Sequence, residues 1–262
     1  MATSDKNQEH CLYADWMNLQ AEELSDLIRH SLNLNSNDAE NTSNNDAEVK
    51  AVLKKIMQNF HDYSDRRRRL ARRDVSAYFC PSWCTTLENS MFWLAGCRPS
   101  SYFSLIYALC GSEIDSKLSQ FLQAEDGDTM GSGFPHLSAS QLSAIDKLQR
   151  RTIADEEKLS TQLAMLQQDM ADMPLALIAR KAGPTYEFDS DVKDAIHRIE
   201  IDMFSIMEAA EDLRLNTVKE IIEILAPVQS LEYILAAKKL RLCFKSWAIE
   251  RDREHGRNLT FE

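Results

Sequence analysis

Apolar residues recur every three or four positions along most of the chain, the spacing that places side chains on one face of an α-helix. A first predicted helix shows this spacing at Leu12, Trp16, Leu19, Leu24, Leu27 and Ile28, with a break near Ala21 and Glu22. A second begins near Ala47, runs into an arginine-rich stretch and shows it at Val49, Leu53, Ile56, Phe60 and Tyr63. Alternating β-branched runs, which would predict strands, are almost absent.

The stretch 87–112, LENSMFWLAGCRPSSYFSLIYALCGS, interrupts an apolar run with the residues Gly-Cys-Arg-Pro. Before the interruption, one helical face is shared by Leu87, Met91, Leu94 and Ala95. Gly96 is free to adopt the left-handed conformation that ends a helix, and Pro99 can begin the next one. We therefore predict two buried helices joined by a tight turn, with Arg98 bonding carbonyls at the end of the first helix.

A long helix is predicted from Ser138, because Ser138 and Gln141 have the spacing of a capping box. Its apolar stripe follows Ile145, Thr152, Leu159, Leu163, Leu166 and Met170, with Gln149 and Glu156 on the same stripe. This imperfect stripe favours packing within a bundle over a free coiled coil. After Pro174 and Gly183-Pro184, two more helices are expected, one through residues 196–207 and a last one beginning after Pro227.

These patterns predict an all-α fold, a multi-helix bundle with long amphipathic helices and disordered loops. Seven glycines and six prolines in 262 residues agree with a mostly helical chain. We expect one helical domain over residues 10–253, with mobile loops at 33–48 and 124–137. Residues 1–9 and 254–262 are expected to be disordered.

Charge and cysteine content narrow the functional classes. The formal net charge of -11 argues against a chain that coats nucleic acid or acidic membranes through its overall charge. The longest apolar runs are shorter than the roughly 20 residues of a membrane span, so we expect no membrane partner. Six cysteines, far apart except for Cys80 and Cys84, and no apolar leader indicate reduced thiols in an intracellular protein.

The sequence lacks the common catalytic and metal-binding motifs. It contains no phosphate-binding glycine loop, no His-Glu-x-x-His pair and no Gly-x-Ser-x-Gly elbow. The six histidines are scattered, and no two of them lie within one helical turn. We therefore expect neither an enzyme nor a metal site.

An arginine run is the first candidate interaction segment. The stretch DRRRRLARRD contains Arg66, Arg67, Arg68, Arg69, Arg72 and Arg73. A basic patch of this kind suits a nuclear import signal or a nucleic-acid contact. It equally suits a helix end whose arginines pair with acidic residues of the same chain.

Two further segments have the composition of binding helices. In residues 238–254, one face holds Leu240, Phe244 and Trp247, beside Lys238, Lys239, Arg241 and Lys245. Such a helix suits a calmodulin-like groove, or it is the last helix of the bundle with Trp247 buried. Near the N-terminus, Tyr13 and Trp16 are spaced to lie together, either anchoring a partner or capping the core.

Several segments together resemble the delay-of-germination family of plant proteins. They are CLYADWMNLQ, LENSMFWLAGCRPSSYFSLIYAL, the helix from residue 137, ILAPVQSLEYILAAKKL and the closing W-x-x-x-R-D-R, which cover residues 10 to 253. The same segments are more loosely similar to the C-terminal domain of TGA-class bZIP transcription factors. The resemblance implies a helical, non-catalytic regulator of seed dormancy, germination and abscisic-acid signalling in nucleus and cytoplasm. It also implies that the protein binds and restrains type 2C protein phosphatases.

Site residues carry over from this resemblance only in part. The family's phosphatase-binding segment corresponds to residues 11–16, where Tyr13 and Trp16 match and Asp15 replaces a glutamate. Cys11 and Leu12 stand where the family has aspartate and serine, which implies a change in partner choice. The phosphatase-contact candidates are therefore Tyr13, Asp15 and Trp16.

The family also binds haem through two histidines four residues apart on the last helix. Arg241 and Lys245 occupy these positions here, and neither protonated side chain can ligate iron, so we predict no cofactor. Two alternatives to phosphatase binding stay open. One is a TGA-like transcription-regulatory module that acts through transcription factors or, by Arg66 to Arg73 alone, through sequence-specific DNA binding. The other is calmodulin binding by residues 238–254, and self-association is compatible with each.

Overall fold

The computed structural model describes residues 2–36, 42–111, 136–171, 174–181 and 190–257. Within these ranges the regular structure is helical, apart from one isolated bridge between Trp93 and Gly96. The predicted all-α class is confirmed. The labelled helices are α1 (Ala2–Ser36), α2 (Thr42–Ala71), α3 (Ser76–Phe79), α4 (Thr86–Ser90), α6 (Ala139–Asp169), α7 (Leu175–Lys181), α8 (Ser190–Ile224) and α9 (Pro227–Glu254). Residues 101–111 are also helical.

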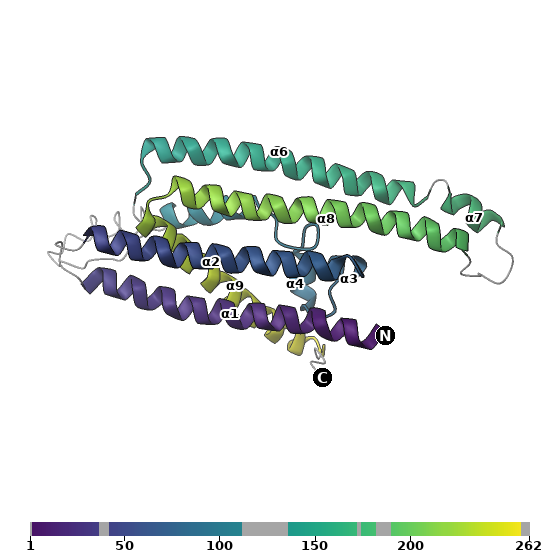
Figure 1. Cartoon of the computed structure of the whole chain (residues 1–262), viewed down its shortest axis with the longest axis horizontal. Coiled ribbons are helices and arrows are strands. Elements are labelled where there is room, and N and C mark those ends of the chain that lie inside the picture. Colours follow the sequence, from purple (N-terminus) through teal and green to yellow (C-terminus); the bar gives the residue numbers. More distant parts are fainter. Residues whose placement is uncertain (1, 37–41, 112–135, 172–173, 182–189, 258–262) are drawn as a thin grey trace.

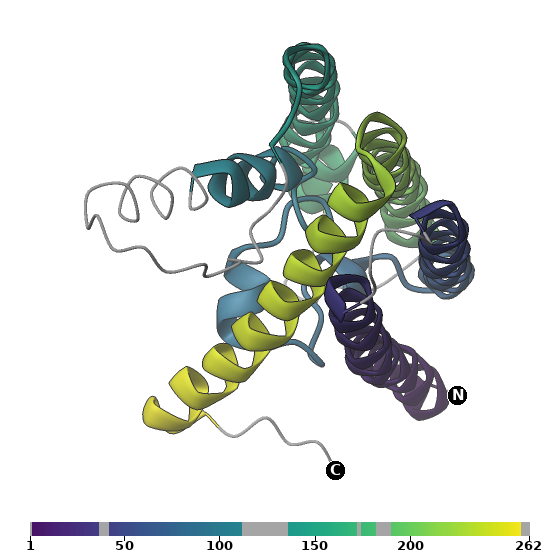
Figure 2. The same cartoon turned by 90° about the vertical axis from the view of Figure 1, so that its left-hand side faces the viewer.

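Four long helices run alongside one another, and α9 crosses them (Figures 1 and 2). Helices α1 and α2 form one antiparallel pair, and α6 and α8 form another, which extends beyond the first pair towards α7 (Figure 1). Helix α9 packs along α1 and also contacts α2, α4 and α8. Because α1 lies against both α2 and α9, segments from the two ends of the sequence meet there.

The largest apolar core forms where α9 and residues 101–111 pack against the long helices. Its fully buried members include Leu27, Phe103, Ile106, Ile145, Ile221 and Leu231. They recur at helical spacing within their elements, which is why the apolar pattern predicted the fold. The Ser138–Gln141 capping box is confirmed, and Pro227 occupies the first turn of α9 as expected.

The helices at the N-terminal end are longer than predicted. Helix α1 begins at Ala2, so the prediction of a disordered segment over residues 1–9 is wrong for residues 2–9. The predicted loop at 33–48 is also too long, because α1 ends at Ser36 and α2 begins at Thr42. Asparagine and serine have only a weak bias against helix, which does not exclude them from helix ends. Residues 37–41, 124–135 and 258–262 of the predicted loops and tail lie outside the described residues.

The predicted helix–turn–helix at residues 87–112 is wrong in its first half. Helix α4 ends at Ser90, and a two-residue turn follows in which Trp93 N donates to Gly96 O at 2.7 Å. The left-handed residues are Leu94 (φ 45°) and Ala95 (φ 63°), and Gly96 is not one of them. Side chains with a Cβ rarely adopt this conformation, so other contacts must stabilise the turn.

Candidate interaction site

The three segments proposed from the sequence as interaction sites converge in the structure. Helix α1 places Asp15 near Arg66 of α2, and it places Tyr13 and Trp16 against α9. We call the contact between these helices the α1–α9 junction. It comprises Tyr13, Trp16 and Glu23 of α1, Glu88 of α4, and Lys238, Arg241 and Lys245 of α9.

Tyr13 belongs to the buried part of the junction. Its side chain is 5% exposed, and its hydroxyl donates to Glu88 Oε1 at 2.7 Å. The Lys245 ammonium lies 4.8 Å from the centre of the Tyr13 ring, a cation–π contact. Burial raises the pKa of Tyr13 above its ordinary value. Of the two interpretations of Tyr13, the structure supports a core role.

Trp16 and Asp15 lie on different sides of α1. Trp16 is half-buried and stacks on Tyr63 with ring centres 4.2 Å apart and on Phe60 at 6.0 Å. Asp15 is exposed, and its carboxylate lies 4.0 Å from the Arg66 guanidinium. Among the three phosphatase-contact candidates, Asp15 is thus the one that presents its side chain to solvent.

Lys238 is buried in the junction, although the sequence grouped it with the basic residues of a binding helix. Its ammonium donates to Glu23 Oε2 at 2.5 Å and to Gln20 Oε1 at 2.8 Å. Asn59 donates to the other oxygen of Glu23 at 2.7 Å. Burial lowers the pKa of Lys238 below its ordinary value, although Glu23 opposes the shift. Lys238 therefore ties α9 to α1.

Arg241 and Lys245 also have partners within the chain. Arg241 lies 3.6 Å from the buried carboxylate of Glu88, and Lys245 lies over Tyr13. The structure thus uses the family's two histidine positions for contacts to α4 and α1. A guanidinium and an ammonium do not ligate haem iron, so these residues do not fit that group.

The outer face of α9 carries exposed apolar residues. Leu240 is 50% and Trp247 is 62% exposed, while Phe244 is half-buried. The alternative in which Trp247 is buried in the bundle is therefore wrong. The hydrophobic repeat of α9 has two apolar faces, and a sequence pattern alone does not tell which face meets the core.

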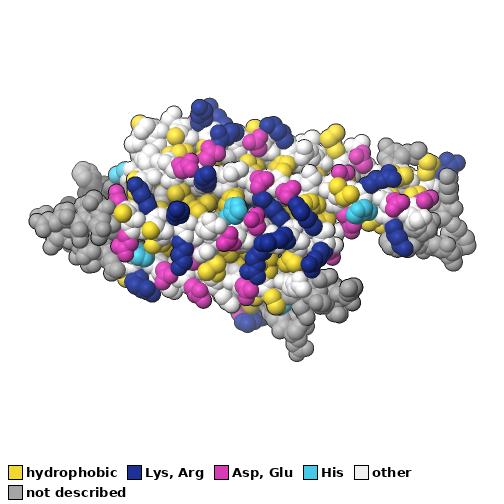
Figure 3. All heavy atoms as spheres, in the orientation of Figure 1, with side chains coloured by type: hydrophobic (Ala, Val, Ile, Leu, Met, Phe, Trp, Pro, Cys, Tyr) yellow, Lys and Arg dark blue, Asp and Glu magenta, His cyan; other side chains and the backbone are white. Residues whose placement is uncertain are grey.

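The arginine run divides into inward and outward side chains. Arg67 pairs with Glu211, and Arg68 pairs with Asp212. Outside, Arg72 lies 3.7 Å from Glu208, and Arg73 donates to Gln8 at 3.3 Å. Figure 3 shows basic side chains gathered over the C-terminal half of α2 with carboxylates among them. Pairing within the chain accounts for much of the run, and nuclear import or nucleic-acid binding stays a prediction.

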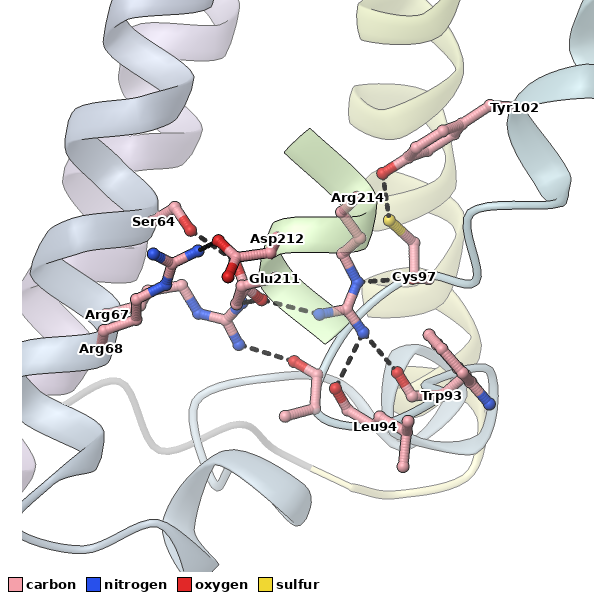
Figure 4. A network of polar contacts seen from close by, with 11 residues as sticks. Ser64, Arg67, Arg68, Trp93, Leu94, Cys97, Tyr102, Glu211, Asp212 and Arg214 are labelled. Carbon is pink, nitrogen blue, oxygen red and sulfur yellow. Dashed lines mark hydrogen bonds and ion pairs between the residues drawn. The ribbon is translucent and has the colours of Figure 1, made fainter. Parts of the chain in front are cut away.

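Two arginines hold the turn at residues 93–97, in a group that we call the turn clamp: Arg67, Glu211 and Arg214 (Figure 4). Arg214 donates to the carbonyls of Trp93 at 2.6 Å, Leu94 at 2.8 Å and Cys97 at 2.7 Å. Arg67 donates to the carbonyl of Ala95 at 2.6 Å. These bonds to charged donors offset the unfavourable backbone conformation of the turn.

Glu211 supplies the negative charge of the turn clamp. It is 1% exposed and accepts from Arg67, from Arg214 at 2.7 Å and from Ser64 at 2.9 Å. Burial alone would raise the pKa of Glu211, but the two guanidiniums and Ser64 hold it below its ordinary value. The carboxylate therefore stays ionised between two cations, which it bridges.

Arg98 does not bond helix-end carbonyls, so that prediction is wrong. Its guanidinium donates to Glu156 Oε2 at 2.7 Å, and Glu156 is fully buried on α6. Arg214, distant in sequence, takes the role expected of Arg98. The only sequence signal for these residues is a charged side chain on an otherwise apolar stripe, as at Glu156, Glu211 and Arg214.

The described residues contain no group of three or more histidine, cysteine, aspartate or glutamate side chains that could hold a metal ion. Within the described residues, none of the six cysteines is joined to another by a disulfide bond. No helix within the described ranges combines the length and apolar character that crossing a bilayer requires.

Comparison with known proteins agrees with the resemblance seen in the residues. The family described as seed dormancy control (DOG1) matches residues 25–108. Protein DOG1-like 3 of Arabidopsis thaliana is 36% identical over 97% of this chain and 90% of its own length. Protein RESPONSE TO ABA AND SALT 1 of Arabidopsis thaliana is 27% identical over 71% of the chain and 70% of its own length. Transcription factor TGA2 of Arabidopsis thaliana is 23% identical over 94% of the chain and 65% of its own length. At the identity and coverage shared with Protein DOG1-like 3, the chain belongs to the DOG1 family of seed-dormancy-control proteins.

Proposed function

We propose that this protein is a non-enzymatic regulator of seed dormancy and abscisic-acid signalling that binds and restrains type 2C protein phosphatases in nucleus and cytoplasm. Family membership supports the dormancy role. The name of one relative, RESPONSE TO ABA AND SALT 1, supports the link to abscisic acid. The phosphatase partner comes from the resemblance of residues 11–16 to the family's binding segment.

The observation that carries the proposal is the two-sided packing of α1 at residues 11–16. Tyr13 is held in the core by Glu88, and Trp16 by Tyr63, while Cys11 and Asp15 are exposed. Buried aromatic residues on one side fix the orientation of the exposed residues on the other. In this arrangement Asp15 contacts the phosphatase, and Tyr13 and Trp16 position the helix.

The test is calorimetric titration of the full chain against a panel of plant type 2C phosphatases, with phosphatase activity measured in parallel. We expect Asp15→Ala to weaken binding by removing the proposed contact, and to leave the melting temperature unchanged because Asp15 is exposed. Trp16→Ala should weaken binding and also lower the melting temperature, because it removes a half-buried ring. Trp247→Ala, which removes an exposed tryptophan from α9, is the matched control.

Two results would contradict the proposal. If no phosphatase binds the wild-type chain, the restraining mechanism is wrong. If Asp15→Ala binds as tightly as wild type while Trp247→Ala does not, the contact lies on α9 and the assignment to α1 is wrong.

A second candidate function is a transcription-regulatory module, favoured by the similarity to TGA2 over 94% of the chain. It predicts binding to transcription factors or, through Arg66 to Arg73, to DNA. Direct DNA binding would weaken steeply with salt, because arginines at phosphates release counterions. Titration of a duplex at increasing salt separates this function from phosphatase binding.

A third candidate, calmodulin binding, is favoured by the exposed Leu240 and Trp247 on α9. A partner that surrounds the whole helix would have to break the buried contact between Lys238 and Glu23. Calcium-dependent binding that Trp247→Ala abolishes would support this function.

A further inference from the structure

A pocket lies between the N-terminal part of α1 and the C-terminal part of α2, beside the segment at residues 11–16. Its volume is about 370 Å³, and it is lined by Gln8, Cys11, Leu12, Arg66, Arg69 and Leu70. We call it the α1–α2 pocket. A volume in this range accommodates one or two side chains of a bound partner.

The two guanidiniums of the α1–α2 pocket are only weakly engaged by the chain itself. Arg66 lies 4.0 Å from the Asp15 carboxylate, which is beyond hydrogen-bond distance. Arg69 donates through Nε to the backbone carbonyl of Asp65 at 3.3 Å, which leaves its terminal nitrogens for a ligand. The described residues that line the pocket include no carboxylate. A carboxylate from outside is therefore the complementary group.

The floor of the α1–α2 pocket is apolar. Leu12 is 4% exposed, and Leu70 is half-buried. A site with two guanidiniums at its edge and leucine side chains beneath recognises an acidic group next to an apolar one.

We propose that the α1–α2 pocket docks a short acidic segment of a protein partner, in which an aspartate or glutamate lies beside a bulky apolar side chain. This inference rests on the proposed function for the identity of the partner, a type 2C phosphatase. The chemistry of the segment comes from the pocket alone.

The charges around the pocket favour an acidic peptide over nucleic acid. Arg67 and Arg68 turn towards Glu211 and Asp212, so the arginine run does not present a continuous row of cations. Asp15 borders the pocket beside Arg66, and the whole chain carries a net charge of -11. A nucleic-acid backbone would meet these negative charges, whereas one acidic side chain needs only Arg66 and Arg69.

The direct test uses a fluorescein-labelled peptide, Gly-Ser-Glu-Phe-Glu-Leu-Ser-Gly, and a control peptide with glutamine in place of each glutamate. Fluorescence anisotropy should show that the wild-type chain binds the acidic peptide about tenfold more tightly than the control, because charged hydrogen bonds are lost in the control. The double substitution Arg66→Gln and Arg69→Gln should remove this preference. Arg72→Gln, an arginine of the same run that does not line the pocket, should keep it.

A charge exchange makes the test more specific. A chain with Arg66→Glu and Arg69→Glu should prefer a peptide in which lysine replaces each glutamate. Cys11→Phe should reduce binding of the acidic peptide by filling the pocket while both arginines remain. Thermal unfolding of each variant confirms that the fold survives, as expected for exposed positions.

Equal binding of the acidic and control peptides by the wild-type chain would overturn the proposal. So would an equal loss of preference in Arg72→Gln, or displacement of the peptide by a DNA duplex with steep salt dependence. The phosphatase titration separates the two proposals. If a phosphatase binds wild type and the Arg66/Arg69 double variant equally, the pocket proposal fails and the proposed function stands. If the acidic peptide binds selectively but no phosphatase binds, the proposed function fails and the chemistry of the pocket stands.

Discussion

The turn clamp and the Lys238–Glu23 pair of the α1–α9 junction both bury ionic groups, but they use different cations. The clamp places Glu211 between two guanidiniums, whereas the junction pairs Glu23 with the ammonium of Lys238. A guanidinium keeps its proton throughout the accessible pH range, while a buried lysine loses its proton more readily. Burial indeed lowers the pKa of Lys238. The clamp is therefore electrostatically fixed, and the junction can change its charge.

The two regions also stabilise different kinds of structure. The clamp bonds four backbone carbonyls of a turn with two left-handed residues. The junction joins the side chains of α1 and α9, and each of these helices retains its own backbone hydrogen bonds. Loss of the clamp should therefore cost more than loss of the corresponding pair in the junction.

The largest expected effect comes from Glu211→Gln. This change leaves Arg67 and Arg214 buried without a carboxylate, and it should lower the free energy of unfolding by about 3 to 5 kcal/mol. Urea denaturation measures the change. The control is Asp212→Asn on the same helix, an exposed partner of Arg68 that should change stability by less than about 0.5 kcal/mol. Equal losses in both variants would contradict the importance of the clamp.

A smaller loss is expected for Glu23→Gln in the junction, about 1.5 to 3 kcal/mol at neutral pH. Without Glu23 the folded-state pKa of Lys238 falls further below its unfolded value, so the unfolded state binds more protons and stability rises with pH. The difference from wild type should therefore shrink as pH rises towards the ordinary pKa of lysine. Denaturation at two pH values measures this change. The stability loss caused by Glu211→Gln should stay the same over this pH interval. If it also became smaller, the proposed contrast between the turn clamp and the junction would be wrong.

Gly96→Ala tests the geometry of the clamp without changing a charge. A Cβ at Gly96 would lie 2.9 Å from Arg214 Cζ, and Arg214 cannot move aside without breaking its bonds to the turn. We expect a loss of about 1 to 3 kcal/mol in thermal or chemical unfolding. Gly111→Ala is the matched control, because a Cβ there meets no atom within 4 Å and alanine favours helix.

The last prediction concerns the change of stability with pH and involves Cys84, which lies near Tyr13 and Glu88. Burial, followed by the charge of Glu88, raises the pKa of the Cys84 thiol from 9.0 to about 12. Because the folded-state pKa is raised, the protonated Cys84 thiol contributes fully to the free energy of unfolding below pH 9.0. This contribution is lost as the pH rises towards about 12. Between these pH values the free energy of unfolding should fall less steeply with pH in Cys84→Ala than in wild type. The two slopes should differ by up to about 1.4 kcal/mol per pH unit, as measured by urea denaturation across this range. Cys11→Ala, which removes an exposed thiol, should follow the wild-type curve.

Much of the fold follows from the apolar spacing of the sequence. The start of α6 at its Ser138 cap and the start of α9 at Pro227 were both predicted, because capping and proline signals act locally. The end of α4 was not, because the two left-handed residues are held by arginines from other helices. Local propensity contains no information about such partners.

The sequence predicted which segments form the candidate site, but it did not predict which of their side chains are buried and which are exposed. Tyr13 and Trp16 were recognised as a pair, yet the sequence alone could not tell an exposed anchor from a core contact. Lys238 was grouped with surface lysines because its partner, Glu23, is 215 residues away in the sequence. Buried polar pairs of this kind interrupt an apolar stripe at only one position on each helix, which is a weak signal in a single sequence.

The turn at residues 93–97 is completed by an arginine more than a hundred positions later in the chain, 117 residues after Cys97 and 121 after Trp93. During synthesis, the ribosome therefore releases this turn long before Arg214 is available to bind it. Until then Arg67 also lacks Glu211, and the N-terminal helices hold uncompensated charge at their future contact with α8. We expect the N-terminal half to remain incompletely packed until α8 has been synthesised and packs against it.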